Sequence, residues 1–418
     1  MIKKFKYQHL ISNFSYMFVI EMANYIFPFL VIPYIVQTVG VTNFGLITFS
    51  YVLVSYFNLF INYGFHMLIV KDISLHQHSQ KRLNFLFSKM YTSQLILLII
   101  SIIIFIGLIQ IPSFLENKTI FIYAFGMVIG NFLFPVWFFQ GIEKMKFIAL
   151  FNFFSRLLYL VLILTFIKTQ DDYSFVILIN SFSVLVTGIL SLVYVLLKYQ
   201  VKFTFIKITQ IRRFFKDAWS LFISFITVHF YSSFNIMVLG LFAGYTAVGV
   251  YSLADKIFGA LSKLMSILNL VIFPLLAKLS KKRKVLIFKI RQLIVVYIIA
   301  LSLLSVLLFI SSEMLISILY GENNETAIYI LKVFSFVLLV YPLGQIFSSY
   351  MVIKNESYKI QKITLHTMIT NMLVVFPLIY FYQEVGLVFA VLITQYAQIY
   401  FNITQNKELI RNGEKYEQ

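Results

Sequence analysis

The sequence contains no cysteine, no nucleotide-binding loop and few acidic residues. The lack of cysteine among 418 residues excludes disulfides and thiolate metal sites. No G-x-x-x-x-G-K-[ST] segment occurs, which excludes a P-loop nucleotide engine. Only 16 residues are acidic against 34 basic ones, and charged residues make up 12% of the chain. This low charge content lies outside the composition of soluble globular domains.

The low content of charged residues is accompanied by a high content of apolar residues. Hydrophobic residues make up 60% of the chain and aromatic residues 18%, which indicates a polytopic membrane protein. Since about 20 apolar residues cross a bilayer as a helix, the sequence predicts twelve spans. They lie near residues 10–38, 43–70, 86–110, 119–140, 147–167, 174–197, 217–242, 247–277, 291–311, 326–351, 361–382 and 386–405.

The basic residues predict the topology. In this scheme 28 of the 34 lie on the side of the N-terminus, Lys118 and Lys168 lie on the other side, and four lie within spans. Because basic residues stay in the cytoplasm, both termini are expected there. The net charge of +18 is thus assigned to topology and to membrane lipids as partners, and no nucleic acid is expected.

The predicted architecture is all-α, with two six-helix lobes around a central cleft. Residues 1–198 form the N-terminal lobe, 199–216 a basic cytoplasmic linker, 217–406 the C-terminal lobe and 407–418 a cytoplasmic tail. The connections on the outer side are short, so no extracytoplasmic domain is expected.

A weak internal repeat supports two related halves. Gly40–Gly45 and Gly244–Gly249 share the pattern G-x-T-x-x-G at an offset of 204 residues, and Pro135 and Pro342 are 207 apart. Six spans separate the copies, so the halves have the same orientation and are expected to be related by an axis along the membrane normal. Such a molecule can expose a cleft alternately to the two sides.

The eighth predicted span carries charge. Tyr251–Lys278 contains Asp255, Lys256 and Lys263. A charge at bilayer depth costs at least about 2.5–3.5 kcal/mol, so it is expected to face a bundle interior or a hydrated space. Lys256 and Lys263 are seven residues apart and share a helix face, together with Ser252, Gly259 and Ser266, whereas Asp255 and Lys256 do not face each other.

Four segments carry a resemblance to a known family. They are Ala23–Pro28, Tyr63–Phe65, Pro135–Lys146 (PVWFFQGIEKMK) and Val248–Lys256, and the third is the most specific. Together they resemble the Wzx-type O-antigen and polysaccharide flippases of the MOP superfamily. The resemblance implies a two-lobed transporter, not an enzyme, in the cytoplasmic (inner) membrane of a bacterium. It would move undecaprenyl-diphosphate-linked glycan to the outer leaflet, with a glycan polymerase and glycosyltransferases as pathway partners.

A flippase must pass a diphosphate and its sugars through hydrocarbon, and Arg and Lys bind phosphate oxygens by charge-assisted hydrogen bonds. The substrate-binding candidates are therefore Arg156, Lys256 and Lys263, with Asn24 and Tyr25 on the face of the first span that also carries Glu21. Structural pairing with buried acids is the competing role for the lysines.

Glu21 and Asp255 are candidates for proton or sodium coupling, because intramembrane carboxylates commonly serve that purpose. Neutralising a nearby cation is an equally good role for them. His229 and His366 lie in separate spans, so no metal or cofactor site is predicted.

Two other functions fit parts of the sequence. A MATE-type drug or cation antiporter would share the architecture, but a cationic substrate favours an acidic site, and the spans hold four basic residues. A membrane glycosyltransferase or O-antigen polymerase is expected to have a large extracytoplasmic loop, whereas the longest one predicted here is 312–325.

Overall fold

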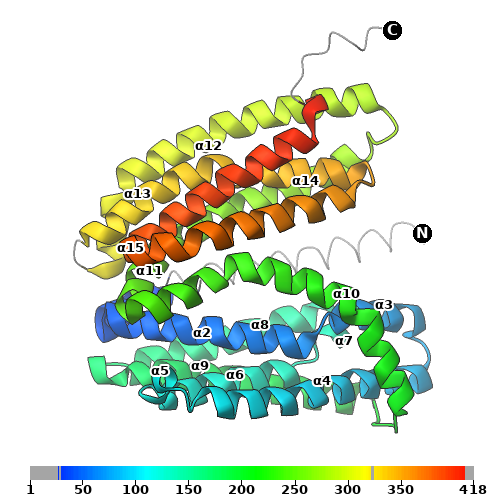
Figure 1. Ribbon diagram of the computed structural model, residues 1–418. Helices are drawn as coiled ribbons and strands as arrows, with labels where there is room; N and C mark the ends of the chain where they lie inside the picture. Colours follow the sequence, from blue (N-terminus) through cyan, green and yellow to red (C-terminus); the bar gives the residue numbers. More distant parts are fainter. Residues whose placement is uncertain (1–26, 28–29, 322–323, 410–418) are drawn as a thin grey trace. The chain divides into compact units, whose positions relative to one another are not determined.

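The computed structural model describes residue 27 and residues 30–321 and 324–409 of the chain. Within this part all regular secondary structure is helical (Figure 1), which confirms the predicted all-α class. Nine helical segments among the described residues are long and apolar enough to cross a membrane, and a shorter apolar helix covers Leu30–Val39. The nine are Val41–Asn62, Gln80–Leu108, Lys118–Gly141, Met145–Phe166, Gln170–Lys198, Phe234–Ser266, Arg283–Tyr320, Glu325–Ile353 and Ser357–Gln405.

The chain divides into two compact units, Met1–Ile226 and Thr227–Gln418. The helices that begin in the first unit are α2 (Val41–Asn62), α3 (Phe65–His76), α4 (Gln80–Leu108), α5 (Pro112–Leu115), α6 (Lys118–Leu133), α7 (Val136–Gly141), α8 (Met145–Phe166), η1 (Gln170–Asp172), α9 (Tyr173–Lys198) and α10 (Ile208–Ser232).

The segment predicted as a linker belongs to the first unit. Its backbone is attached to the start of α4, because the Lys202 amide donates to Asn84 Oδ1 at 3.0 Å and the Thr204 amide donates to Ser88 Oγ at 2.8 Å. Gln80 Nε2 donates to the Tyr199 carbonyl at 2.9 Å. These bonds satisfy backbone groups that would otherwise need water. The segment is thus held along α4.

Aromatic stacking attaches α10 to the same unit. Tyr63 and Gly64 adopt positive φ angles of 44° and 75°, which end α2 and start α3, so the single span predicted here is two helices. The Tyr63 ring stacks on Phe222 with centroids 4.2 Å apart, and Phe65 stacks on Phe214 at 4.5 Å. Such pairs add about 0.5–1.5 kcal/mol beyond their buried area.

Helices α6 and α9 approach closely at two glycines. A Cβ at Gly188 would lie 2.5 Å from the Gly130 carbonyl oxygen, and a Cβ at Gly130 would lie 2.8 Å from the Leu185 amide nitrogen. Small residues allow this approach in membrane bundles, where van der Waals packing between helices replaces the hydrophobic effect.

The second unit contains the remaining helices. They are α11 (Phe234–Ala277), α12 (Arg283–Tyr320), α13 (Glu325–Val340), α14 (Leu343–Ile353), α15 (Ser357–Gln405) and η2 (Lys407–Leu409). The ranges of α11 and α15 each include a residue with non-helical backbone angles.

These breaks lie near predicted loops. In α11 the break is Gly244, and in α15 it is Gln383, whose φ of 51° and ψ of −126° turn the chain between the spans predicted at 361–382 and 386–405. The two arms of α15 pack against each other, since Asn371 Nδ2 donates to Thr394 Oγ1 at 3.3 Å. The arms run side by side in Figure 1.

In each unit a proline separates two consecutive helices. Phe134 is extended (φ −83°, ψ 103°), as expected for a residue before proline, and Pro135 separates α6 from α7. Pro342 likewise separates α13 from α14. In both units the short helix after the proline ends two residues before a residue with positive φ, which is Glu143 at 58° and Asn355 at 60°.

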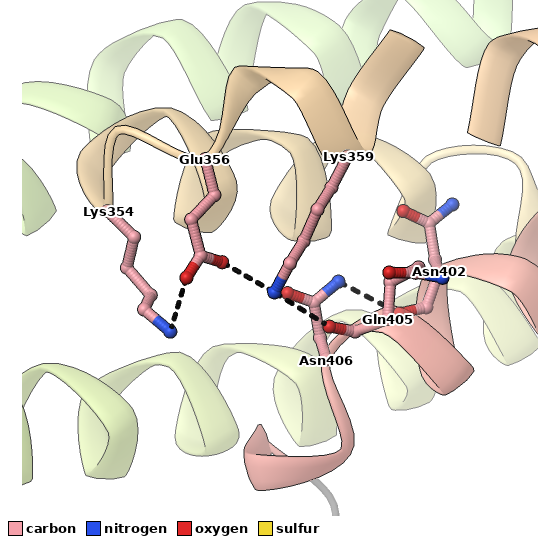
Figure 2. A network of polar contacts seen from close by, with 6 residues as sticks. All are labelled: Lys354, Glu356, Lys359, Asn402, Gln405 and Asn406. Atoms are coloured by element: carbon pink, nitrogen blue, oxygen red, sulfur yellow. Dashed lines mark hydrogen bonds and ion pairs between the residues drawn. The ribbon is translucent and has the colours of Figure 1, made fainter. Parts of the chain in front are cut away.

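The turn after α14 is held by a charged network (Figure 2). Glu356 accepts from Lys354 Nζ at 3.2 Å and from Lys359 Nζ at 2.7 Å. Lys359 Nζ also donates to the Gln405 carbonyl at 3.3 Å, at the other end of α15. Leu409, just beyond, is buried, and its carbonyl accepts from Arg291 Nε at 2.9 Å. The first residues of the predicted tail therefore pack on the second unit.

Candidate functional site

Arg156 lies near the midpoint of α8, on the face directed into the first unit. Asn152, Arg156 and Tyr159 follow at steps of four and three, and all three are half-buried. Ile148 and Ile163 lie on the same face and are buried. The other side of α8 carries exposed apolar residues, and the exposed polar residues Lys146 and Thr165 lie near its ends. The apolar ones are Leu150, Phe153, Phe154, Leu157, Val161 and Leu164. The predicted cation is thus turned away from the face of α8 that suits lipid.

Lys256 and Lys263 lie together on the exposed side of α11. Both are exposed, with Leu264 and Leu268 exposed beside them at 51% and 47%. A Cβ placed on Gly259, one turn from each lysine, would meet nothing within 4 Å. This side of α11 therefore combines two ammonium groups with apolar surface.

The predicted polar stripe of α11 is only partly open. Ser252 was expected on the face of the two lysines, but it is fully buried among packed helices. Ser266 is half-buried and accepts a hydrogen bond from Gln345 Nε2 of α14 at 2.6 Å. The two serines share the helix face of the lysines by their spacing, but neighbouring helices cover them, and spacing alone does not reveal this.

Asp255 occupies a different side of α11 from the lysines. The residue is half-buried, and its carboxyl lies close enough to Tyr251, Tyr341 and Lys256 to interact with them electrostatically. Tyr341 lies between α13 and α14, so the acid faces the packed side of the helix. The sequence-based expectation that Asp255 and Lys256 diverge on the helix agrees with this placement.

Glu21, Asn24 and Tyr25, the predicted site residues of the first span, lie outside the described residues. Their roles stay predictions. Among the predicted site residues that the structure describes, Arg156 lies in the first unit, and Asp255, Lys256 and Lys263 lie in the second.

Each proline break positions a glutamine that sequence analysis did not assign to a site. Gln140 Oε1 lies 2.6 Å from His66 Nε2, which joins α7 to α3. Gln345 makes the corresponding connection from α14 to Ser266 of α11. The shared order Pro then Gln in the two halves was the signal that could have identified these connections.

The chain matches one protein family and two curated relatives. Residues 10–280 match the family described as "Polysaccharide biosynthesis protein". A protein of Escherichia coli (strain K12) named "Putative O-antigen transporter" is 27% identical over 388 residues, covering 92% of this chain and 93% of the relative. A protein of Shigella dysenteriae with the same name is 26% identical over 398 residues, covering 93% and 98%.

Solved structures share the fold. An inward-facing multidrug resistance MATE family transporter of the MOP superfamily superposes with a TM-score of 0.64 at 13% identity, covering 95% of this chain and 98% of that one. The lipid II flippase MurJ, in an inward closed conformation, has a TM-score of 0.54 at 13% identity and 87% coverage of both chains. Identities this low show the fold alone.

The matched family and the two curated relatives point to the same class of protein as the segment Pro135–Lys146. The chain is a multi-pass bacterial membrane protein. It belongs to the polysaccharide biosynthesis protein family, and its predicted resemblance to the Wzx-type O-antigen and polysaccharide flippases is confirmed.

Proposed function

We propose that this protein flips undecaprenyl-diphosphate-linked oligosaccharide from the cytoplasmic to the outer leaflet of the bacterial inner membrane. Family membership and the two O-antigen transporter relatives support a lipid-linked polysaccharide flippase in general. The diphosphate-linked substrate, the direction and the alternating-access mechanism are the finer parts of the proposal. We also propose that the chain has twelve spans in two six-helix lobes, that both termini lie in the cytoplasm, and that a glycan polymerase and glycosyltransferases are its pathway partners.

The observation that carries the proposal is the exposed side of α11. Lys256 and Lys263 offer ammonium groups to phosphate oxygens, and Leu264 and Leu268 offer apolar surface to an isoprenoid chain. An amphiphilic anion needs both kinds of surface at once. Arg156, facing into the first unit, is a second candidate cation for phosphate.

The test is flipping of the lipid-linked glycan in vesicles prepared from a flippase-null strain. Lys256→Ala and Lys263→Ala should each lower the flipping rate about tenfold, and the double variant more, since a hydrogen bond to a charged group contributes about 1.5–3 kcal/mol. Lys281→Ala, which removes an exposed lysine from the turn before α12, is the matched control. Full activity of the double variant removes the binding role. Activity towards cationic drugs with none towards the glycan would favour a drug antiporter.

Asp255 and Glu21 are proposed to couple transport to an ion gradient. If Asp255 takes up and releases a proton during the cycle, Asp255→Asn should make the flipping rate insensitive to an imposed pH gradient while leaving binding of the glycan lipid intact. An unchanged response to the gradient in both Asp255→Asn and Glu21→Gln would end the coupling role of these carboxyls.

A further inference from the structure

Three helices of the first unit bring uncharged polar groups to one point. Asn180 Nδ2 of α9 donates to the Tyr51 hydroxyl of α2 at 2.9 Å, and the Tyr51 hydroxyl also hydrogen-bonds with the Tyr159 hydroxyl of α8. Tyr159 lies one turn beyond Arg156 on the same inward face of α8. The network therefore adjoins a predicted phosphate-binding cation.

Further polar residues follow Tyr51 along α2. Tyr51, Ser55, Asn58 and Asn62 follow at steps of four, three and four, so they share one face of the helix. All four keep accessible surface, whereas the neighbouring positions 53, 54, 57 and 61 are buried. One accessible stripe of α2 is thus polar over three turns within a predicted membrane span, and half-buried Val52 and Leu59 lie beside it.

Accessible polar groups within a predicted membrane span indicate contact with water or a polar ligand, because lipid chains cannot form hydrogen bonds with them. Tyr51, Tyr159 and Asn180 are each half-buried, so all three residues retain accessible surface. The apolar exposed side of α8 lies on the opposite face from Tyr159. Polar groups in membrane bundles are placed towards the interior or towards water. A hydrated space inside the first unit accounts for both observations.

The network also has unused hydrogen-bonding capacity. An asparagine side chain offers two donors and an acceptor with two lone pairs, and a tyrosine hydroxyl offers one donor and an acceptor. Among the described residues, the Asn180 side chain makes only the bond to Tyr51. Helix–helix adhesion alone would be served by that bond. The remaining donors and acceptors are available to a ligand that has hydroxyl groups of its own.

We propose that Tyr51, Tyr159 and Asn180 form a sugar-binding site in the first unit. Sugar hydroxyls both donate and accept, which matches uncharged amide and phenol groups better than lysines, and tyrosine rings add flat apolar surface for a sugar ring. The site takes the glycan of the lipid-linked substrate, while the cations take its diphosphate. This inference rests on the proposed flippase function and adds the part of the substrate that the first unit recognises.

The experiment measures binding of two lipids to the purified full chain in detergent. One is undecaprenyl diphosphate without sugar, and the other is the glycan-bearing lipid extracted from the host strain. Tyr51→Phe, Tyr159→Phe and Asn180→Leu should each weaken binding of the glycan-bearing lipid about threefold to tenfold, as expected for one lost hydrogen bond, and should leave the sugar-free lipid unaffected. Tyr91→Phe is the matched control, because the Tyr91 hydroxyl also bonds across the first unit, to the Leu133 carbonyl at 3.0 Å.

The possible outcomes distinguish failure of the sugar-binding site from failure of the proposed flippase function. Equal weakening for both lipids, or no weakening, overturns the sugar site while the flippase function stands. The same result follows if Tyr91→Phe weakens glycan binding as much as Tyr51→Phe does, because the effect would then come from packing. A wild-type protein that binds neither lipid overturns the proposed function, and the sugar site falls with it. Thermal unfolding of each variant shows whether the near-isosteric tyrosine changes leave the fold intact.

Discussion

Gly40 and Gly244, 204 residues apart in sequence, have the same backbone conformation. Gly40 has φ 82° and ψ 163°, and Gly244 has φ 83° and ψ 177°. Each is followed by a helix that begins with the same spacing of threonine and a second glycine. The internal repeat seen in the sequence therefore has a counterpart in the local backbone of both units.

This shared conformation predicts a strain penalty at both glycines. The region near φ 80° and ψ 180° is essentially restricted to glycine, and a residue forced into it costs about 1–3 kcal/mol. Gly40→Ala and Gly244→Ala should each lower the free energy of unfolding by that amount, measured by thermal or denaturant unfolding in detergent. Gly259→Ala is the control, because a Cβ there meets nothing within 4 Å. If Gly40→Ala and Gly244→Ala lower the free energy of unfolding no more than Gly259→Ala does, the glycine-only backbone conformation at these two positions is contradicted.

The contact between α6 and α9 predicts a third sensitive glycine, Gly188. In Gly188→Ala the new Cβ would approach the Gly130 carbonyl oxygen to 2.5 Å, so the helices must separate. Overpacking of this kind typically costs about 1–3 kcal/mol. The unfolding temperature should fall clearly below that of Gly107→Ala, where a Cβ meets no atom within 4 Å. Equal unfolding temperatures would show that α6 and α9 are not in this close contact.

The hydrogen bond between His66 and Gln140 should be detectable as an energetic coupling. Because the two side chains lie 2.6 Å apart, the stability losses of His66→Ala and Gln140→Ala should be non-additive by about 0.5–1.5 kcal/mol in a double-mutant cycle. His76 is the control position, since its Nδ1 contacts the Asp72 carbonyl of its own helix. The stability losses of His76→Ala and Gln140→Ala should add in the double variant. If those of His66→Ala and Gln140→Ala also add, the hydrogen bond between them contributes nothing.

The Glu356 network predicts an acid-dependent loss of stability. Partial desolvation of the carboxyl is outweighed by hydrogen bonds from Lys359 and Lys354, so the pKa of Glu356 lies below its ordinary value. The folded state then favours the ionised form, and this stabilisation is fully present above the ordinary glutamate pKa of about 4.3. It is lost as the pH falls through the lowered pKa of the folded protein.

Glu356→Gln should remove this pH-dependent part. Its unfolding temperature should be lower than that of the wild type at neutral pH, and the difference should shrink as the pH drops below about 4. The effect should be below about 1 kcal/mol, as for other accessible ion pairs. Glu325→Gln, at an exposed position at the start of α13, should give no such trend. A constant difference from pH 7 to pH 3 would contradict the role of the network.

Several elements followed directly from the sequence. The all-helical class was set by the long apolar segments, because a chain in hydrocarbon must satisfy its backbone hydrogen bonds internally. The turn at Gln383 lies between two predicted spans, and Pro135 and Pro342 interrupt helices as their lack of an amide hydrogen requires. The divergence of Asp255 and Lys256 was predictable from helical geometry alone.

Other features depended on contacts between distant segments. The attachment of residues 199–207 to α4 could not be predicted, since their basic composition also suits a free cytoplasmic linker. The break at Tyr63 and Gly64 lies within a continuous apolar stretch, and the burial of Ser252 depends on its neighbours.

The sequence by itself determined that this chain is a helical membrane protein, and it predicted two related halves with cations within the spans. Apolar length, helical spacing and turn residues act locally, so they can be read from the chain. Only the tertiary structure decided which polar groups meet. It brought Tyr51, Tyr159 and Asn180 together from three helices and separated Asp255 from the accessible lysines of α11. The reason is physical: the rotation and depth of each helix are set by the summed packing of its neighbours, which no single segment encodes.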